Sequence, residues 1–494
     1  MLSATHVNAA VAACLSPGER AWVVGGAVRD ALLGCEVNDL DYAVGGDAER
    51  VARATADRLG GAFFTYSERF STHRVALSGG VVDFSPLRGT GIDADLAARD
   101  FTVDAMAWPV EASWPFGEAA AECPAAALVD PLGGVADLRT RRLATCSPTA
   151  FADDPLRLVR LVRLARALGF TPASGVLSAA RAAACGLAAV SGERVETELT
   201  ALLGLPDAAA AVRDLDDVGA LEVILPEVTT LKGVEQNRFH HHDVYDHTLE
   251  ALERAPAIVE QLGGARFLAP PEACGLPGAA PLAPLGYVML FHDLGKPVVK
   301  QSGEDGRIMF WHHDSVGSDM AVAIADRLGL SRRFRAYLTI LIVNHLRLGF
   351  LVREAPLTRR ALARYRRAVE PYVFESIVVS LADRLATRGE KTSATSIARH
   401  FRLARRVWLE IPKESRPALL SGEEVMGLLG IGPGPPIGEA LAALQDEADA
   451  LEVTRKDEAV AFLRRWWEAR QAAGAGDEER EPPGGGDLQE SGGA

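Results

Sequence analysis

Residues 21–44 read AWVVGGAVRDALLGCEVNDLDYAV, and this stretch contains the pattern that determines the expected fold of the first part of the chain. The apolar, β-branched run from Ala21 to Val24 predicts a short buried strand. Gly25 and Gly26 follow it, and an apolar helix is expected after them. A glycine pair between a strand and a helix lets backbone N–H groups approach a phosphate closely, and Arg29 is placed to reach the same phosphate. Taken alone, such a glycine pair is more often only a turn.

Two aspartates stand on the next expected strand, Asn38 to Val44. Because residues i and i+2 of a strand point to the same side, Asp39 and Asp41 present their carboxylates on one face, and Leu40 and Tyr42 lie on the other. Two parallel carboxylates repel each other unless a cation lies between them, and hard oxygen ligands suit Mg²⁺. A bare pair of this kind is more often solvated. The glycine turn before it favours phosphoryl transfer instead, because a phosphate cradle and a metal pair then fall on adjacent elements.

The composition and the hydrophobic pattern of the sequence change along the chain. An α/β pattern of short β-branched runs, glycine turns and amphipathic stretches comes first, and long Ala/Leu/Arg helices follow it. One such helix is expected over 156–169, with Asp153 as N-cap, Pro155 in the first turn and Gly169 as C-cap. The predicted regions are an α/β head over 1–149, a helical neck over 150–235, a histidine-containing region over 236–400, a C-terminal helical region over 401–473 and a disordered tail over 474–494.

The composition is that of a soluble globular protein, since 48 % of the 494 residues are apolar and 24 % are charged. The net charge is −14, yet residues 331–410 contain 17 Lys and Arg against 6 Asp and Glu. Such local positive charge favours contact with a polyanion, although a solvated helical face would show the same composition. No apolar run reaches the ~18 residues of a membrane helix. We expect a cytoplasmic protein without a membrane partner, also because its six cysteines lack CxxC spacing: Cys14, Cys35, Cys123, Cys146, Cys185 and Cys274.

Several motifs resemble, in order, the sequence blocks of the class II tRNA nucleotidyltransferases, a family of CCA-adding enzymes and their poly(A) polymerase relatives. The glycine turn and the aspartate pair are similar to the first block. The others resemble the RRDFTINA, DxxGGxxDL and EDxxR blocks of the family and occupy Arg99 to Ala107, Asp130 to Leu138 and Asp153 to Arg157, with Ser191 to Arg194 continuing the last. Four blocks in the family's order make the resemblance specific.

The resemblance implies an α/β nucleotidyltransferase head with a small mixed sheet, followed by an all-α body. It implies a template-independent enzyme that adds or repairs the 3′-terminal CCA of tRNA with CTP and ATP. Asp39 and Asp41 would be catalytic and hold Mg²⁺, and Asp154 and Arg157, at i and i+3 on one helix face, would select the base. Without the family blocks, the latter two would be an ordinary helix salt bridge. The nucleotide-binding residues that it implies are Gly25, Gly26, Arg29, Arg99, Asp104, Asp154, Arg157 and Arg160.

The chain departs from the family pattern at three positions, since Ala98, Asp104 and Asp153 stand where the family has Arg, Asn and Glu. Only ten residues, Gly89 to Ala98, occupy the place of a flexible loop that in the family helps to change the pocket from C to A. Addition of CC alone therefore competes with full CCA addition as the expected activity. Two rival interpretations are a poly(A) polymerase and a nucleic-acid-binding scaffold with inactive sites.

A second set of residues follows the pattern H…HD…H…H…D. A lone histidine in an apolar helix is usually a core residue, but a carboxylate buried beside imidazole is costly without a metal. The set resembles the HD-domain phosphohydrolases, which implies an HD domain that hydrolyses phosphomonoesters and 2′,3′-cyclic phosphodiesters with Ni²⁺, Mn²⁺ or Co²⁺. The implied ligands are His247, His292, Asp293 and Asp383, with His313 and His345 for a second metal. Four others, His240, His241, His242 and His312, are expected at the surface or beside the ligands.

The C-terminal helical region carries a weaker resemblance. Leu420 to Val425, followed by the Gly/Pro-rich run Gly432 to Gly438, resembles a module in which such a turn starts a helix of the tRNA-binding region. A plain corner between two helices would explain the same run. Together with the basic residues 331–410, it predicts that the helical body holds the acceptor and T arms of tRNA through phosphate contacts and shape.

Overall fold

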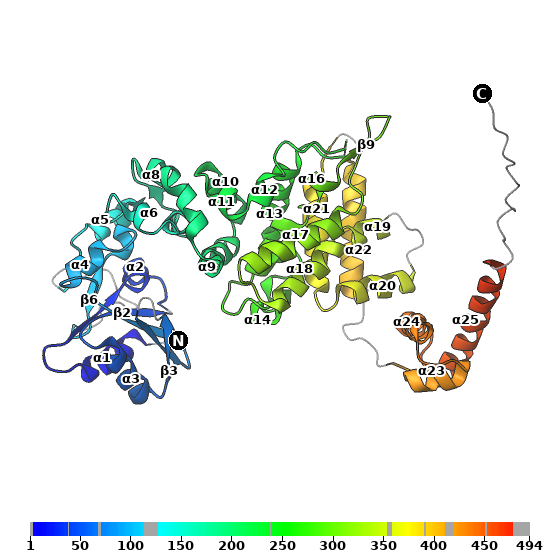
Figure 1. Cartoon of the computed structure of the whole chain (residues 1–494), viewed down its shortest axis with the longest axis horizontal. Helices are drawn as coiled ribbons and strands as arrows, with labels where there is room; N and C mark the ends of the chain where they lie inside the picture. Colours follow the sequence, from blue (N-terminus) through cyan, green and yellow to red (C-terminus); the bar gives the residue numbers. More distant parts are fainter. Residues whose placement is uncertain are drawn as a thin grey trace, which may run out of the picture.

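The structure is a computed structural model that describes residues 3–37, 39–67, 71–112, 127–237, 239–352, 358–389, 392–410, 418–449 and 452–477. Asn38 and Cys123 lie outside these residues. The predicted mixed α/β head and mostly helical body are both confirmed. In Figure 1 the head, neck, body and C-terminal helices follow one another along the long axis, and the head and the C-terminal helices project to the same side of the body.

The head is built on a six-stranded sheet with the order β3-β4-β5-β2-β1-β6. Within this sheet β2 and β5 pair in parallel, whereas the other neighbours are antiparallel, so the sheet is mixed. The elements of the head are α1 (Ala4–Cys14), β1 (Arg20–Val24), α2 (Gly26–Leu32), β2 (Leu40–Gly45), α3 (Ala48–Leu59), β3 (Ala62–Ser67), β4 (Thr72–Leu77), β5 (Gly80–Pro86), α4 (Ile92–Ala97), η1 (Thr102–Asp104), β6 (Ala107–Pro109), α5 (Gly134–Thr140) and β7 (Arg142–Leu143).

The two faces of the sheet have different neighbours. Helices α1 and α3 cover the face on which Leu40 and Tyr42 are buried, as their alternation with the aspartates predicts. On the other face, a smaller apolar cluster forms between the sheet and the segment from α4 to β6, and it includes Trp22, Ala43 and Leu96. Asp41 alternates with Tyr42 and therefore lies on this second face, beside the residues of the family blocks.

The neck consists of α6 (Ala150–Asp153), α7 (Arg157–Leu168), β8 (Thr171–Pro172), α8 (Val176–Ala183), η2 (Ala184–Ala189), α9 (Gly192–Leu203), α10 (Ala208–Asp217), α11 (Ala220–Ile224) and α12 (Pro226–Thr229). Helix α7 is the predicted helix, and Gly169 ends it in the left-handed conformation. The prediction that Asp153 caps it is wrong, because Asp153 closes the separate helix α6. Pro155 is the reason: it disfavours helical backbone at the preceding Asp154, which is extended with φ −150°.

The body is a bundle of helices around α15, a helix that is buried on all sides. Its elements are α13 (Val244–Gln261), η3 (Ala265–Phe267), α14 (Pro271–Cys274), α15 (Ala283–Phe291), α16 (Lys296–Val299), β9 (Gln301–Ser302), β10 (Ile308–Met309), α17 (His313–Arg327), α18 (Arg332–Asn344), α19 (Arg347–Leu351), α20 (Arg359–Val369), α21 (Val373–Ala386) and α22 (Ala394–Glu410). Among the described helices there is no candidate membrane span.

The predicted boundary after residue 400 falls inside α22 and is wrong. Helix α22 packs on α21, and Leu403, Ala404 and Val407 belong to the same apolar core as the rest of the body. The helical periodicity continues across residue 400, so the body extends to the end of α22. The change in amino-acid composition near residue 400 therefore does not coincide with the end of the apolar core of the body.

The C-terminal region has a core of its own, formed by α23 (Gly422–Leu429), α24 (Pro435–Asp449) and α25 (Lys456–Asp477). Helix α24 begins at Pro435, as the Gly/Pro run predicts. Helix α25 continues past residue 474, where a disordered tail was expected to begin, and residues 478–494 lie outside the described residues. An ion pair between Arg367 and Asp446, 2.7 Å apart, links the region to α20.

Candidate functional site

Three aspartates gather at one end of β2. Asp39 lies directly before β2, Asp41 lies on it, and Asp83 on β5 stands opposite Asp41 in the parallel register. Burial by the surrounding protein and the neighbouring Asp83 carboxylate raise the pKa of Asp41 to about 6. Arg99 and Arg160 oppose this rise, whereas Asp39 adds to it, so three negative charges are crowded here beside two guanidinium groups. A divalent cation relieves such crowding, so these oxygen donors fit the Mg²⁺ expected at Asp39 and Asp41.

Asp83 is a site residue that the sequence did not single out. Its carboxylate accepts two hydrogen bonds from the Arg74 guanidinium, both 2.7 Å long, which fix its orientation next to Asp41. One signal was present, because Asp83 is a charged residue between the apolar Val82 and Phe84 of a strand. Its partner strand is distant in sequence, however, and only the fold shows which carboxylate it faces.

The glycine turn lies beside the carboxylates because β1, which precedes it, pairs with β2, and Val24 stands opposite Asp41. Gly25 has a φ of 73°, a conformation that favours glycine. A Cβ on Gly25 would lie 3.2 Å from Arg99 Nη1 and 3.6 Å from Asp41 Oδ2. Glycine is therefore favoured at position 25 for two reasons, the positive φ of its backbone and the close approach of the Arg99 side chain. Gly26 begins α2.

Replacing Gly25 by alanine is expected to lower nucleotide addition on the order of 10- to 100-fold, because the new methyl group pushes the Arg99 guanidinium away from its place beside Asp41. Gly18 offers a matched control, since it has a φ of 89° but a Cβ there meets no atom within 4 Å. Both substitutions strain a backbone with a positive φ, so both should lower the temperature of thermal unfolding. The rate of CMP addition should fall only in Gly25→Ala. Equal rates in the two variants would contradict this role of Gly25.

A network of arginines and acids forms the wall next to Asp41. Arg29 Nη1 lies 2.6 Å from Asp104 Oδ1, so the structure pairs Arg29 with a residue of the next block. Arg160 connects Asp100, at 2.5 Å, with Asp104, at 3.9 Å. Burial raises the pKa of Asp104, and Arg29 opposes the rise. The carboxylate that replaces the family's asparagine is thus accommodated between two guanidinium groups.

Asp154 and Arg157 do not share a helix face, so that part of the prediction is wrong. Asp154 stands in the break between α6 and α7, and its Oδ2 lies 2.6 Å from Arg194 Nη2. Arg157 begins α7, and its Nη2 donates to Ala98 O at 2.8 Å. The break before Pro155 places the two residues on separate elements. Their backbones are joined, since Arg157 N donates to Asp154 O at 3.1 Å, but their side chains are held by different partners.

Five of the predicted residues, Asp41, Arg99, Asp154, Arg157 and Arg160, nevertheless line one cavity, whereas Asp39, Gly25, Gly26, Arg29 and Asp104 are not part of its lining. Its volume is about 690 Å³, which is in the range of small-molecule sites, and its lining includes Asp41, Asp83, Arg99, Asp154, Arg157 and Arg160. The segment Gly89 to Ala98 contributes α4 to this region, where Asp95 accepts a hydrogen bond from Arg88 N at 3.0 Å and pairs with Arg99 at 3.0 Å. The short segment that replaces the family's loop is therefore bonded to a residue of the cavity.

The structure also brings together the six residues of the H…HD…H…H…D pattern, which come from α13, the end of α15, α17, the end of α18, and α21. Asp293 is at the centre. Its Oδ2 lies 3.5 Å from His247 Nε2 and 3.3 Å from His292 Nε2, and its Oδ1 lies 3.5 Å from His313 Nε2. His345 Nε2 is 3.9 Å from the same oxygen, and Asp383 Oδ1 is 3.0 Å from His247 Nε2.

The backbone orients these imidazoles toward Asp293. The Nδ1 atoms of His292, His313 and His345 lie 2.8, 2.8 and 2.6 Å from the carbonyl oxygens of residues 289, 310 and 342, so the Nε2 atoms turn inward. The buried Nε2 atoms of His247 and His292 face the carboxylates of Asp293 and Asp383 but make no hydrogen bond of good geometry among the described residues. Imidazoles whose Nδ1 is held by a carbonyl and whose Nε2 converges on a carboxylate form a donor set that fits a divalent metal.

Two further residues lie at this cluster: Lys296, for which no role was expected from the sequence, and His240, which was expected at the surface or beside the ligands. Lys296 Nζ lies 2.6 Å from Asp293 Oδ2 and donates to Gln236 Oε1 at 2.7 Å. Burial alone would raise the pKa of Asp293, but the Lys296 ammonium and the His292 imidazole hold it well below its usual range. The ring of His240 packs edge-on against His247, and burial lowers its pKa to about 3. His240 therefore lies beside the ligands and not at the open surface.

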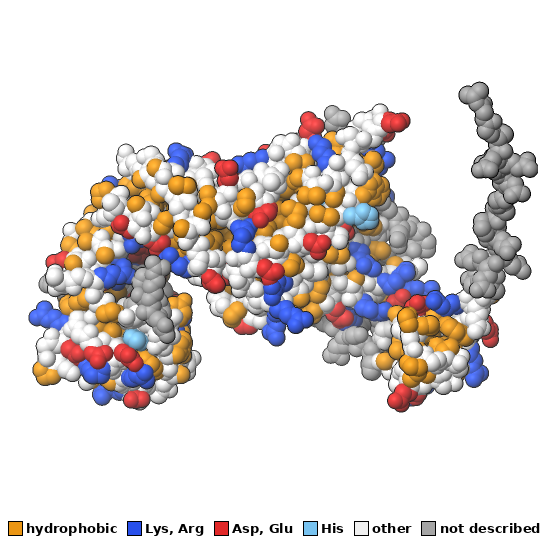
Figure 2. Space-filling view, in the orientation of Figure 1, with side chains coloured by type: hydrophobic (Ala, Val, Ile, Leu, Met, Phe, Trp, Pro, Cys, Tyr) orange, Lys and Arg blue, Asp and Glu red, His pale blue; other side chains and the backbone are white. Residues whose placement is uncertain are grey.

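The basic residues 331–410 lie on α18, α20, α22 and their connections. Figure 2 shows Lys and Arg side chains gathered on the lower side of the body, around α18 and α20 and toward α24. Arg332, Arg333 and Arg364 are exposed there. Arg360 and Arg367 are instead paired with Glu447 and Asp446 of α24. Part of the local positive charge therefore holds the C-terminal region, another part is paired within the body, as Arg388 is with Glu250, and a third part faces solvent.

Comparison with known proteins matches two parts of the chain to family models. Residues 21–144 match the poly A polymerase head domain, and residues 169–231 match the probable RNA and SrmB-binding site of polymerase A. The first match contains the three aspartates and the glycine turn. The second begins directly after α7 and covers most of the neck.

Two relatives match nearly the whole chain. The A-adding tRNA nucleotidyltransferase of Deinococcus radiodurans is 36 % identical over 90 % of this chain and 95 % of its own length. The CC-adding tRNA nucleotidyltransferase of Thermus thermophilus is 35 % identical over 92 % and 96 %. The fold is similar to that of the Bacillus stearothermophilus CCA-adding enzyme in complex with CTP, with a TM-score of 0.61, 21 % identity and coverage of 95 % and 98 %. With these relatives, the chain belongs to the tRNA nucleotidyltransferase family.

Proposed function

We propose that this tRNA nucleotidyltransferase adds or repairs the 3′-terminal CCA of tRNA without a template, with CTP and ATP as substrates. The observation that carries the proposal is the single cavity shared by Asp41, Asp154 and Arg157. Asp39 and Asp41 would hold Mg²⁺ there, which when bound activates the 3′-hydroxyl and neutralises the triphosphate. The tRNA substrate is supported by the names of two relatives that match along most of their length.

The base is read, in this proposal, by Asp154 and Arg157. A carboxylate acceptor near a guanidinium donor forms a hydrogen-bonding edge that can match cytosine or adenine without a template strand. Arg194 holds Asp154 from α9, whereas the carbonyl of Ala98 holds Arg157 from the end of α4. Because different elements hold the two residues, tertiary packing sets the spacing of this edge. The arginines Arg99 and Arg160 would face the triphosphate from the wall of the cavity, and Arg29 would act from behind them through Asp104, which pairs with both Arg29 and Arg160.

The acceptor and T arms of tRNA would lie against the exposed arginines of α18 and α20, with the C-terminal helices beside them. Support comes from their arrangement in space, because these elements face the side on which the head also projects (Figures 1 and 2). Recognition there would use phosphate charge and the shape of the RNA, since arginines on a helix surface contact the backbone of a duplex.

Separate supply of the two nucleotides tests the proposal. We expect CTP alone to extend tRNA that lacks its 3′ end by two residues, and ATP alone to extend tRNA ending in CC by one residue. Gel analysis of the 3′-labelled products measures both. The relatives named A-adding and CC-adding make this test informative, because failure of one nucleotide identifies an enzyme with half of the activity. A long poly(A) product on RNA other than tRNA would overturn the proposal in favour of a poly(A) polymerase.

The buried histidine cluster favours a second function, and for it we propose a metal-dependent phosphohydrolase of the HD type. His247, His292, Asp293 and Asp383 would hold one divalent transition metal, such as Ni²⁺, Mn²⁺ or Co²⁺, and His313 and His345 a second. The bound metal would supply an activated water. A cavity of about 850 Å³ adjoins the cluster and includes Lys296, His240 and Arg307 in its lining, so cationic and imidazole groups are available to a phosphomonoester or a 2′,3′-cyclic phosphodiester.

A further inference from the structure

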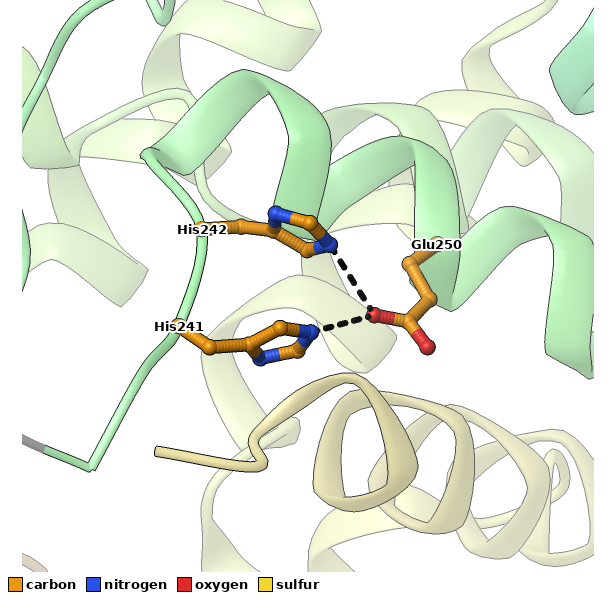
Figure 3. A group of neighbouring side chains, drawn as sticks. All are labelled: His241, His242 and Glu250. Carbon is orange, nitrogen blue, oxygen red and sulfur yellow. Dashed lines mark ion pairs between the residues drawn. The ribbon is translucent and has the colours of Figure 1, made fainter. Parts of the chain in front are cut away.

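Three side chains that neither site uses meet at the beginning of α13. His241 and His242 precede the helix, Glu250 lies on it, and Figure 3 shows both imidazoles turned toward the Glu250 carboxylate. His241 Nε2 lies 3.2 Å and His242 Nε2 3.5 Å from the same oxygen, Glu250 Oε2. The three potential ligand atoms all lie within 4.8 Å of one another. Two nitrogens and one oxygen therefore surround a common point.

Glu250 is oriented before any ligand arrives. Its side chain is only 8 % exposed, and its Oε1 accepts hydrogen bonds from Arg254, at 3.0 Å, and from Arg388. Its Oε2 is buried and faces the two imidazoles, but it accepts no hydrogen bond of good geometry from the described residues. A buried carboxylate oxygen that accepts no hydrogen bond is costly. The guanidinium groups thus hold one oxygen and leave the other for a group between the two imidazoles.

The backbone that carries the two histidines is also held in place. Asp243 caps α13 by accepting from Asp246 N at 2.8 Å, and its second oxygen accepts from Gly233 N at 2.6 Å. Gln236 Nε2 donates to His242 O at 3.3 Å. Because these bonds fix the chain immediately after His242, the imidazoles need little reordering to bind, and such preorganisation raises affinity.

We propose that His241, His242 and Glu250 bind a divalent transition metal ion at the surface of the body. Two imidazoles and one carboxylate are the donors of many Zn²⁺ sites, and Co²⁺ and Ni²⁺ accept the same set. The histidine side chains are 30 % and 39 % exposed, so the ion reaches them from solvent and completes its coordination with water. Arg254 and Arg388 support the carboxylate from outside, as hydrogen bonds to metal ligands commonly do, and their own exposure of 41 % and 47 % lets water screen their charge.

This site shares no ligand with the buried cluster around Asp293, although α13 carries residues of both, Glu250 in one and His247 in the other. Occupation would fix the loop before α13 to the helix and, through Arg388, to the chain just after α21. The bound metal would therefore stabilise the fold of the body, and it would not contact a substrate of either site.

Titration of the full-length protein with Co²⁺, followed by its visible absorption and by equilibrium dialysis, tests the proposal. We expect the double variant His241→Gln/His242→Gln to bind one equivalent fewer than the wild type. The affinity of the lost equivalent should fall by more than about 100-fold, because loss of an outer partner alone costs 10- to 100-fold. Glu250→Gln should lose the same equivalent, and His6→Gln, which replaces an exposed histidine of the head, should lose none.

A variant of the buried cluster distinguishes metal bound around Asp293 from metal bound at His241, His242 and Glu250. In an Asp293→Asn background, the equivalent at His241, His242 and Glu250 should remain and should disappear only when both histidines are also replaced. Thermal unfolding without metal verifies that the exposed substitutions leave the fold intact, and Zn²⁺ should raise the melting temperature of the wild type more than that of the double variant. Equal Co²⁺ stoichiometry and affinity in the wild type and the double variant would overturn the proposal.

Discussion

Nucleotide addition is expected to fall by more than roughly 100-fold when Asp39 and Asp41 are both replaced by alanine, since loss of even one electrostatic stabiliser costs about that much. The physical reason is the crowding at β2. Asp41 stands opposite Asp83 in the sheet, and burial together with the Asp83 carboxylate raises its pKa to about 6, so a cation bound between these carboxylates, as proposed, would relieve their repulsion. Without them, neither the 3′-hydroxyl nor the triphosphate has a site for its metal. Single-turnover incorporation of labelled CMP into tRNA measures the effect.

The same double variant should hydrolyse a 2′,3′-cyclic phosphodiester at close to the rate of the wild type, because the residues around Asp293 lie in the body. Asp57→Ala is the matched control, since it removes an exposed aspartate of α3 in the same head. Undiminished tRNA extension by Asp39→Ala/Asp41→Ala would show that the polymerising site lies elsewhere. Loss of both activities together would point to a general folding defect, which thermal unfolding would reveal.

Asp293→Asn is expected to have the opposite effect, lowering metal-dependent phosphoester hydrolysis by more than roughly 100-fold while tRNA extension is retained. Asp293 lies within 3.9 Å of four imidazoles and 2.6 Å from Lys296, so a neutral amide removes the central negative charge of the cluster. Asparagine keeps the volume of the buried side chain. Hydrolysis of 2′,3′-cyclic AMP with Ni²⁺, Mn²⁺, Co²⁺ or Mg²⁺ measures the activity.

Asp319→Ala, an exposed position on α17, controls for changes in charge on the body and should retain hydrolysis. The hypothesis of an HD hydrolase fails if the wild type cleaves no phosphoester with any of the four metals. It also fails if Asp293→Asn cleaves as fast as the wild type. In either case the buried cluster would be a structural feature of the bundle.

The head could be predicted well because its signals are local. The strand Ala21 to Val24, the glycine turn and the alternation of Leu40 and Tyr42 with the aspartates all follow from side-chain periodicity over a few residues. The histidine pattern was visible for another reason, since few roles other than metal binding place His and Asp side by side after a fully apolar helix. This prediction rested on the types of the residues, whereas the distances between their side chains could be known only from the fold.

The features that could not be predicted from the sequence depend on tertiary structure. Asp154 and Arg157 have helical spacing, but Pro155 breaks the helix between them, and each residue then finds its partner 40 or more positions away. Asp83 escaped notice because its role comes from pairing with β2, across the intervening β3 and β4. The pair His241 and His242 depends in the same way on Glu250 being buried next to two arginines, which no spacing in the sequence reveals.

The parallel register of β2 and β5 has a practical consequence for assaying this enzyme. A slip of one residue between the two strands would turn either Asp41 or Asp83 into the apolar core and bring a buried neighbour into the cavity, at a large cost in stability. Molecules misaligned in this way are therefore expected to be both unstable and inactive. The amplitude of the first turnover should consequently count the correctly folded molecules in a preparation, independently of how fast each one works.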